Sequence, residues 1–261
     1  MSASMFKPLG LAIGLCLGSS VTLAAEAHPD FTGLWTNGPP AAPAGPPPAA
    51  GAAPAAPPPR GTPVAPPSTM KPEAKKRIEA YQALVRESGA SPGGSCLGTG
   101  MPGSMIGSGG YPMEIVQRPD QLTVIYEAHT EVRHIYLGDR RMKQADRVPG
   151  RNGYSEAHWE GDTLVVETDN LIEQVDQRNT SHSENATVVE RYRLNGTNAK
   201  GQRILVAEWT MNDPDFYTAP LKGTKTWLEV PNGHLLPYEC NEEIWSAKLN
   251  ELAKKAGVPL P

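Results

Sequence analysis

Apolar and polar residues alternate with a period of two along most of the chain after residue 110, a pattern that predicts β-strands. Turn residues separate several of the alternating segments, notably Glu160-Gly161-Asp162 and Asn195-Gly196. Consecutive hairpins predict a mainly β fold, an antiparallel up-and-down (lipocalin-like) barrel, with a sandwich as the alternative. The predicted strands are 113–117, 122–127, 132–137, 154–159, 163–168, 187–194, 203–211 and 222–230.

Two segments have helical spacing instead. In 68–86 the apolar residues recur every three or four positions, and Pro72 suits a first helical turn. The same spacing returns near the end, at Ile244, Leu249 and Leu252. We therefore expect a short N-terminal helix and a C-terminal helix beside the strands.

The first 27 residues have the pattern of a secretory signal. Lys7 precedes an apolar stretch at 9–25, and Ala25-Glu26-Ala27 forms a cleavage site. A membrane anchor is the alternative, but the strongly apolar part is shorter than the roughly 20 residues that a span needs. We predict a periplasmic or secreted protein without a stable membrane anchor after cleavage.

Composition divides the rest of the chain into three parts. Residues 28–38 are read as a short anchoring strand, and 39–67 as a linker made almost entirely of Pro, Ala and Gly. Such a linker has too little apolar area to offset the entropy of ordering. Residues 68–261 form the predicted β-rich domain.

The net charge bears on the kind of partner, and the cysteine content bears on disulfide formation. A net charge of −4 without a basic stripe makes nucleic acid a poor candidate partner. After cleavage only Cys96 and Cys240 remain, so a single disulfide is the default expectation for an exported chain. Two separate buried thiols are the alternative.

The alternation also places charged residues among apolar neighbours inside strands. Glu127 shares a face with Ile125, and Arg133 shares a face with Ile135. Glu190 shares a face with Val188 and Tyr192. A buried charge is costly unless it is paired, and a barrel lumen that holds a ligand is one place for such groups.

These residues form the candidate site. A carboxylate beside an Arg and a His can act as a general base. The alternative is a buried ion pair that fixes strand register, with His182 capping a loop. The predicted catalytic residues are Glu127, His182 and Glu190, and the predicted ligand-binding residues are Arg133, Tyr136, Tyr192 and Trp209.

No cofactor or metal is expected. His129, His134, His158 and His182 could converge, but their spacing matches no metal-binding motif. Phosphate-loop and dinucleotide-binding fingerprints are missing as well.

The run YSEAHWEGDTLVVETD at 154–169 resembles the signature of an uncharacterised family of exported bacterial proteins, G-x-S-x-G-x-W-E-G-D-T-L-V-V-D/E-T. The chain departs from the family at Arg141, where no His-Pro follows, and at Asn241, where the family has His. The resemblance implies export, the same β-rich fold and a disulfide, and implies little about chemistry. Further pieces in the same order are 31–35, 96–102, 111–117, Glu127, 133–136, 182–183, 190–192, 213–214, 217–218 and 238–242.

The leading prediction is an exported barrel that binds a small, partly apolar molecule, with cofactor-free acid–base chemistry on that molecule left open. A lyase, isomerase or hydrolase built on the Glu/His/Arg cluster is one alternative. A non-catalytic structural or interaction module of the cell envelope is the other. Whether the protein is an enzyme, and its oligomeric state, stay open.

Overall fold

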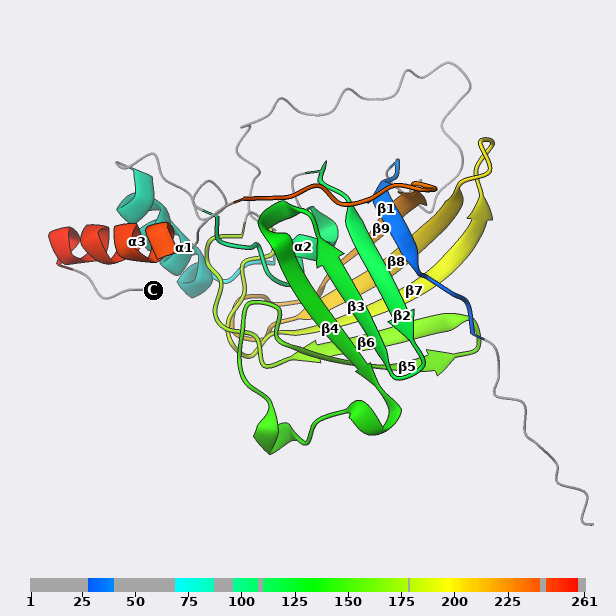
Figure 1. Cartoon of the computed structure of the whole chain (residues 1–261). Coiled ribbons are helices and arrows are strands. Elements are labelled where there is room, and N and C mark those ends of the chain that lie inside the picture. Colours follow the sequence, from blue (N-terminus) through cyan, green and yellow to red (C-terminus); the bar gives the residue numbers. More distant parts are fainter. Residues whose placement is uncertain are drawn as a thin grey trace, which may run out of the picture.

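The protein is a closed barrel of nine strands that follow one another around the barrel in sequence order (Figure 1). The computed structural model describes residues 28–39, 69–86, 96–107, 110–177, 179–239 and 243–257, with the backbone alone for 243–246. The predicted signal segment 1–27 and almost all of the predicted linker lie outside these residues, as does Cys240. The strands are β1 (Gly33–Asn37), β2 (Met113–Arg118), β3 (Gln121–Tyr126), β4 (Glu131–Leu137), β5 (Tyr154–Glu160), β6 (Thr163–Asp169), β7 (Thr187–Thr197), β8 (Arg203–Asn212) and β9 (Leu221–Glu229).

This architecture confirms the predicted barrel over the sandwich. The strands predicted from the alternation begin and end within one residue of β2 to β9, except that β7 continues to Thr197. The segment read as a separate anchoring strand is β1, and it belongs to the barrel itself. Its Trp35 pairs with Met113 of β2 and with Glu229 of β9, so β1 closes the barrel.

One strand pair departs from the predicted antiparallel meander. β4 and β5 are parallel, with Ile135 opposite Ser155. A parallel pair needs a crossover that returns the chain to the starting end of the barrel. Residues 138–153 make that crossover, and they include two short 3-10 turns, η4 (Gly138–Arg140) and η5 (Gln144–Asp146).

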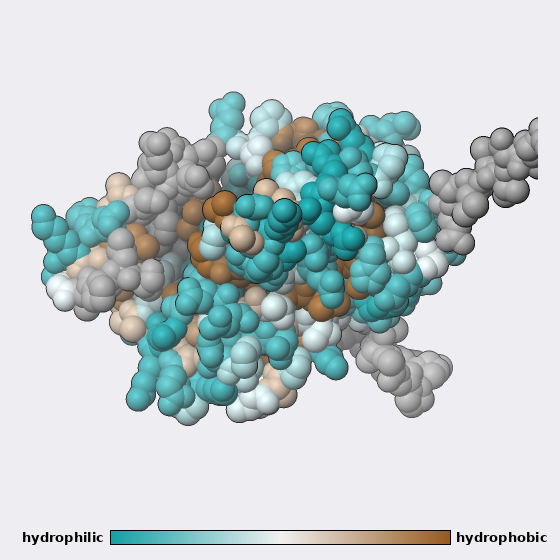
Figure 2. Space-filling model, turned by 90° about the horizontal axis from the view of Figure 1, so that it is seen from below, coloured by the Kyte–Doolittle hydropathy of each residue, from teal (hydrophilic) through white to brown (hydrophobic). Residues whose placement is uncertain are grey.

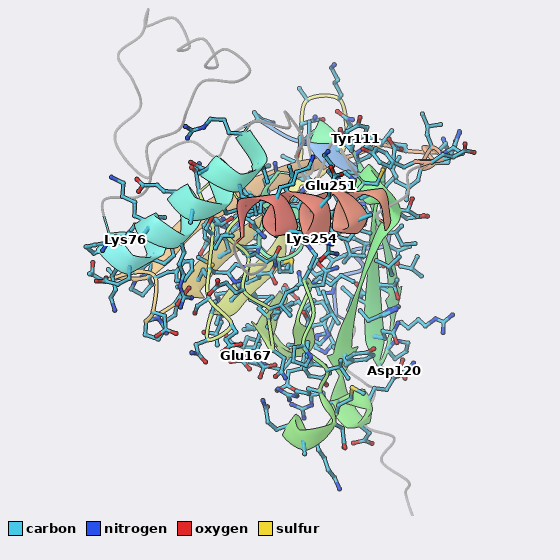
Figure 3. The ribbon with its side chains drawn as sticks, turned by 90° about the vertical axis from the view of Figure 1, so that its left-hand side faces the viewer. Lys76, Tyr111, Asp120, Glu167, Glu251 and Lys254 are labelled. Atoms are coloured by element: carbon cyan, nitrogen blue, oxygen red, sulfur yellow. The ribbon has the colours of Figure 1, made fainter. Side chains whose placement is uncertain are left out.

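The two ends of the barrel differ. Tight connections close one end, here called the hairpin end, where β2 meets β3, β5 meets β6 and β7 meets β8. Longer segments, residues 170–186 and residues 213–220, lie at the other end, here called the loop end, together with the short β3–β4 turn that contains the 3-10 turn η3 (Ala128–Thr130). Asp120 of the β2–β3 turn therefore lies far from the two long helices, residues 72–86 and 243–256, as its label in Figure 3 shows.

In the described part of the chain, three helices lie outside the sheet: α1 (Pro72–Arg86), α2 (Gly103–Ile106) and α3 (Glu243–Ala256). α1 and α3 contact each other beside the loop end (Figure 1). The helix expected over 68–86 is not short, because α1 has 15 residues, and it follows β1 in the chain. Its Ala74 and Tyr81 are buried in the hydrophobic core, which fixes α1 to the barrel.

The face of the molecule that Figure 2 shows is mostly polar. On the face shown in Figure 2, hydrophilic side chains cover most of the area, and hydrophobic patches lie between them. Of the helices within the described residues, none combines the length and the apolar character needed to cross a bilayer.

Candidate functional site

Side chains fill much of the barrel interior. The inward residues of β2, β3, β4 and β6 form a continuous apolar core with Phe31 and Tyr192. Between them lies a cavity with about 10 Å³ of free volume, which is room for about one water molecule. This part of the lumen is therefore a packed core rather than a ligand chamber.

Arg133 and Glu190 meet inside the barrel, as the alternation of β4 and β7 predicts. Both side chains are almost fully buried, with 1% and 0% exposed. The Arg133 guanidinium donates Nη1–H to Glu190 Oε1 at 3.0 Å and Nη2–H to Glu190 Oε2 at 2.5 Å. It also donates to Ser155 Oγ at 3.0 Å and to Thr168 Oγ1 at 2.8 Å, so neighbouring strands hold it in place.

Two tyrosines complete this buried cluster. The Tyr192 hydroxyl donates to Glu190 Oε1 at 2.8 Å, and burial together with the Glu190 charge raises the pKa of Tyr192 well above its usual range. Burial likewise raises the pKa of Tyr126, although the charge of Arg133 acts in the opposite direction. Burial alone would lower the pKa of Arg133, but the charge of Glu190 and its hydrogen bonds raise it above its ordinary value. Both carboxylate oxygens of Glu190 thus accept from protein donors.

Glu127 does not join this cluster, contrary to the sequence prediction. β3 ends at Tyr126, and Glu127 takes up a helical backbone conformation at the start of the turn. Its Oε2 accepts from the Leu236 amide at 2.7 Å, at the loop end. The carboxylate therefore ties the segment before α3 to the β3–β4 turn instead of facing the lumen.

His182 is also placed elsewhere, in the long segment between β6 and β7. It is fully buried, and its ring nitrogens lie 2.9 Å from the Ser183 carbonyl oxygen and 3.0 Å from the Met101 carbonyl oxygen. Burial lowers the pKa of His182, while the two backbone carbonyls act to raise it. This histidine holds two loops together, so the predicted set of Glu127, His182 and Glu190 is not brought together.

A buried hydrogen-bond network that the sequence did not predict lies next to His182. Asp213 accepts four hydrogen bonds, from the Ser183 amide (2.7 Å), the Ser183 hydroxyl (2.8 Å), the Asp215 amide (3.0 Å) and the Phe216 amide (3.1 Å). Although His182, Ser183 and Asp213 are residue types of a hydrolase triad, Ser183 donates to the aspartate and not to the imidazole. All three are buried, so the network links the loops at this end of the barrel.

Tyr136 and Trp209, both predicted to bind the ligand, lie on opposite faces of the barrel wall. Tyr136 lies on the outer side of β4, where its ring stacks on Tyr154 with 5.6 Å between ring centroids. It therefore cannot line the lumen. Trp209 faces inward, because it pairs across β7–β8 with the buried Glu190.

The inner wall formed by β8 and β9 is one part of the barrel interior where inward-facing residues are only partly buried. Four inward-facing residues of these strands are partly exposed: Trp209, Leu221, Gly223 and Lys225. They share the inner face with Met211 and Trp227, which are buried. The Trp209 ring lies across Gly223, where an added Cβ would come within 2.7 Å of the ring atoms. We call these four residues the β8–β9 inner wall. A Lys alternating with Gly223 and Trp227 was the sequence signal that could have revealed it.

Metal ligands do not cluster in the described part of the chain. No group of three or more His, Cys, Asp or Glu side chains there is placed to hold a metal ion. His129 contacts the Tyr238 ring, His134 bonds within β3–β4, and His158 pairs with Glu160 on the surface.

The predicted disulfide involves Cys240, which lies outside the described residues, so the pairing with Cys96 stays a prediction.

Comparison of the chain with sequence profiles of protein families, with curated proteins and with solved structures gives no match. Membership of the exported family suggested by the 154–169 signature stays a prediction as well.

Proposed function

We propose that this barrel binds a small, partly apolar molecule against the β8–β9 inner wall. The observation that carries the proposal is the partial exposure of inward-facing Trp209, Leu221, Gly223 and Lys225 in a barrel whose remaining interior is largely filled. The indole ring of Trp209 packs over Gly223 and offers apolar area to a planar ligand. Ligand sites of this kind are mostly apolar, with a few placed polar groups.

Binding is a better account than acid–base catalysis at the predicted residues. Glu190 is saturated by Arg133 and Tyr192, and it is shielded from solvent. A general base must reach the proton that it removes, so a buried and fully bonded carboxylate is poorly suited to that role. The Arg133–Glu190 pair instead supports the wall by fixing β4 and β7 around the core.

A neutral fluorescent ligand tests the proposal. N-phenylnaphthylamine should bind the protein with one-site stoichiometry and a rise in emission. Trp209→Leu should weaken this affinity about tenfold or more, because aromatic stacking and apolar contact area are both lost. Trp159→Leu is the matched control, since Trp159 is also partly buried but lies at the hairpin end, packed on Phe31. Equal losses of affinity in the two variants would refute the proposal.

We also propose that the protein is exported, to the periplasm or outside the cell, and that Cys96 pairs with Cys240. The signal pattern of 1–27 supports export. The neighbours of both cysteines meet at one turn: the Gly100 amide donates to Glu131 Oε1 at 2.9 Å, and Thr130 Oγ1 donates to the Tyr238 carbonyl at 3.2 Å. Segments held at the same turn are suitably placed to be joined.

N-terminal sequencing of protein recovered from the periplasm checks export, with His28 expected as the first residue.

Peptide mapping without reduction checks the disulfide and should recover Cys96 and Cys240 in one linked pair. Reduction should then cost about 4 kcal/mol of unfolding free energy, since the bond closes a loop of more than about 100 residues. Two unmodified thiols in the oxidised protein would contradict the pairing.

A further inference from the structure

Lys225 is a cation on the inner face of the barrel. Along β9, Gly223, Lys225 and Trp227 point inward, while Lys222 and Thr224 are exposed on the outer face. Across β8–β9, Lys225 is paired with Ala207, whose small side chain leaves space beside it. An inward lysine in a strand is costly unless something compensates its charge.

The described residues provide no carboxylate for it. Lys225 forms no ion pair with any of them, and its Nζ lies 5.9 Å from the centroid of the Trp227 ring. The interior acid Glu190 is bonded to Arg133 and Tyr192, and Glu229 at the far end of β9 is bonded to Arg203. Burial lowers the pKa of Lys225, which is the direction expected for an ammonium group without a counter-charge.

Aromatic side chains lie on both sides of this amine. Toward the loop end, the Trp209 ring covers Gly223, and a side chain at that position would clash with it. Toward the hairpin end, Trp227 stacks on Tyr192, with 6.1 Å between centroids and 20° between planes. Lys225 therefore stands between two indole rings on the partly exposed wall.

We infer that Lys225 binds an oxyanion, a carboxylate or a sulfonate, carried by a planar apolar ligand whose ring packs on Trp209. The inference rests on the proposed function and names the ligand class for that site. An ammonium group would repel a cationic ligand, and a neutral ligand would leave the charge uncompensated. An anion supplies the missing counter-charge, and a hydrogen bond between charged groups changes affinity by about tenfold to a hundredfold.

Two dyes that share an aromatic skeleton separate charge from apolar contact. Anilinonaphthalenesulfonate carries the oxyanion, and N-phenylnaphthylamine is its neutral counterpart. In the mature full-length protein, Lys225→Met should weaken the sulfonate dye about tenfold to a hundredfold and change the neutral dye less than about threefold. Lys225→Arg, which keeps the charge, should retain the affinity for the sulfonate dye.

Lys222→Met is the matched control, because it removes the same charge from the outer face of the same strand. It should leave both affinities unchanged, and near-ultraviolet circular dichroism should confirm that every variant is folded. If Lys225→Met does not fold, Lys225→Gln takes its place as the neutral variant. One outcome overturns the role of Lys225 and leaves the proposed function standing. In that outcome the neutral dye binds, and the sulfonate dye binds the wild type and the neutral variant with equal affinity. If neither dye binds the wild type, the proposed function falls, and this inference falls with it.

Discussion

Arg133 of β4 and Glu190 of β7 approach each other across the barrel interior and join through two parallel hydrogen bonds, of 3.0 and 2.5 Å. The strands that carry them are separated by β5 and β6, whose Ser155 and Thr168 also accept from the guanidinium. One side chain therefore connects four strands, including the parallel pair.

Glu190→Gln should lower the free energy of unfolding by about 3–5 kcal/mol, because it leaves the Arg133 charge buried without a counter-charge. The double variant Arg133→Met with Glu190→Leu should lose much less, since no uncompensated charge remains. Urea titration monitored by tryptophan fluorescence gives both values. A loss below about 1 kcal/mol in Glu190→Gln would show that the pair does not hold the strands.

Asp213→Ala should destabilise the protein by about 3 kcal/mol or more, because four donors from Ser183, Asp215 and Phe216, three of them in buried hydrogen bonds, lose their acceptor. Asp215→Ala is the control: its carboxylate accepts from the exposed Asn185 side chain and, at a longer 3.4 Å, from the Ser183 hydroxyl, which keeps Asp213 as its nearer acceptor. Its loss should cost about 1 kcal/mol or less. The unfolding midpoints of Asp213→Ala and Asp215→Ala are measured under the same conditions and compared. Equal effects would contradict the assignment of Asp213 as the acceptor that links the loops.

His182 should make stability fall with acidification. Because burial lowers its folded-state pKa below the ordinary value of about 6.5, the unfolded chain binds a proton first as the pH falls through that value. The unfolding free energy then falls by up to about 1.4 kcal/mol per pH unit until the folded pKa is reached. Stability curves of the wild type and of His182→Gln, measured between about pH 7 and pH 5, should differ by this slope. Parallel curves would be incompatible with a depressed pKa.

Gly223→Ala should displace the Trp209 ring, because the new Cβ would lie 2.7 Å from ring atoms. We expect a loss of about 1–3 kcal/mol, typical of overpacking, together with weaker binding of N-phenylnaphthylamine. Gly150→Ala is the control, since nothing lies within 4 Å of its added Cβ. If Gly223→Ala kept the wild-type stability and dye affinity, the contact between Trp209 and β9 would have no role in the site.

Much of the fold could be predicted from the sequence, because the strands alternate regularly. The inward positions of Leu122, Val124 and Tyr126, and those of Arg133 and Glu190, follow from period two alone. The parallel β4–β5 pair could not be predicted, since residues 138–153 contain little periodicity that shows where the chain goes. Nothing in a period-two pattern states whether a connection turns back or crosses over.

The candidate site was only partly predictable, for a related reason. Glu127 and His182 lie just outside strands, where alternation no longer fixes the direction of a side chain. Lys225 lies inside a strand, and its alternation with Trp227 was readable. A lysine is usually taken as a solvent-facing residue, however, and here the inward positions of its neighbours decide its orientation.

The pairing of β1 with β9 has a kinetic consequence. Trp35 and Glu229 are partners across this seam although they lie about 200 residues apart in the chain, a separation that makes contact formation slow. The barrel cannot shut until its last strand is available, so an incomplete chain would leave β1 and β8 with open edges that can recruit other strands. We therefore expect the seam to be assembled last, and aggregation to compete with folding until it forms.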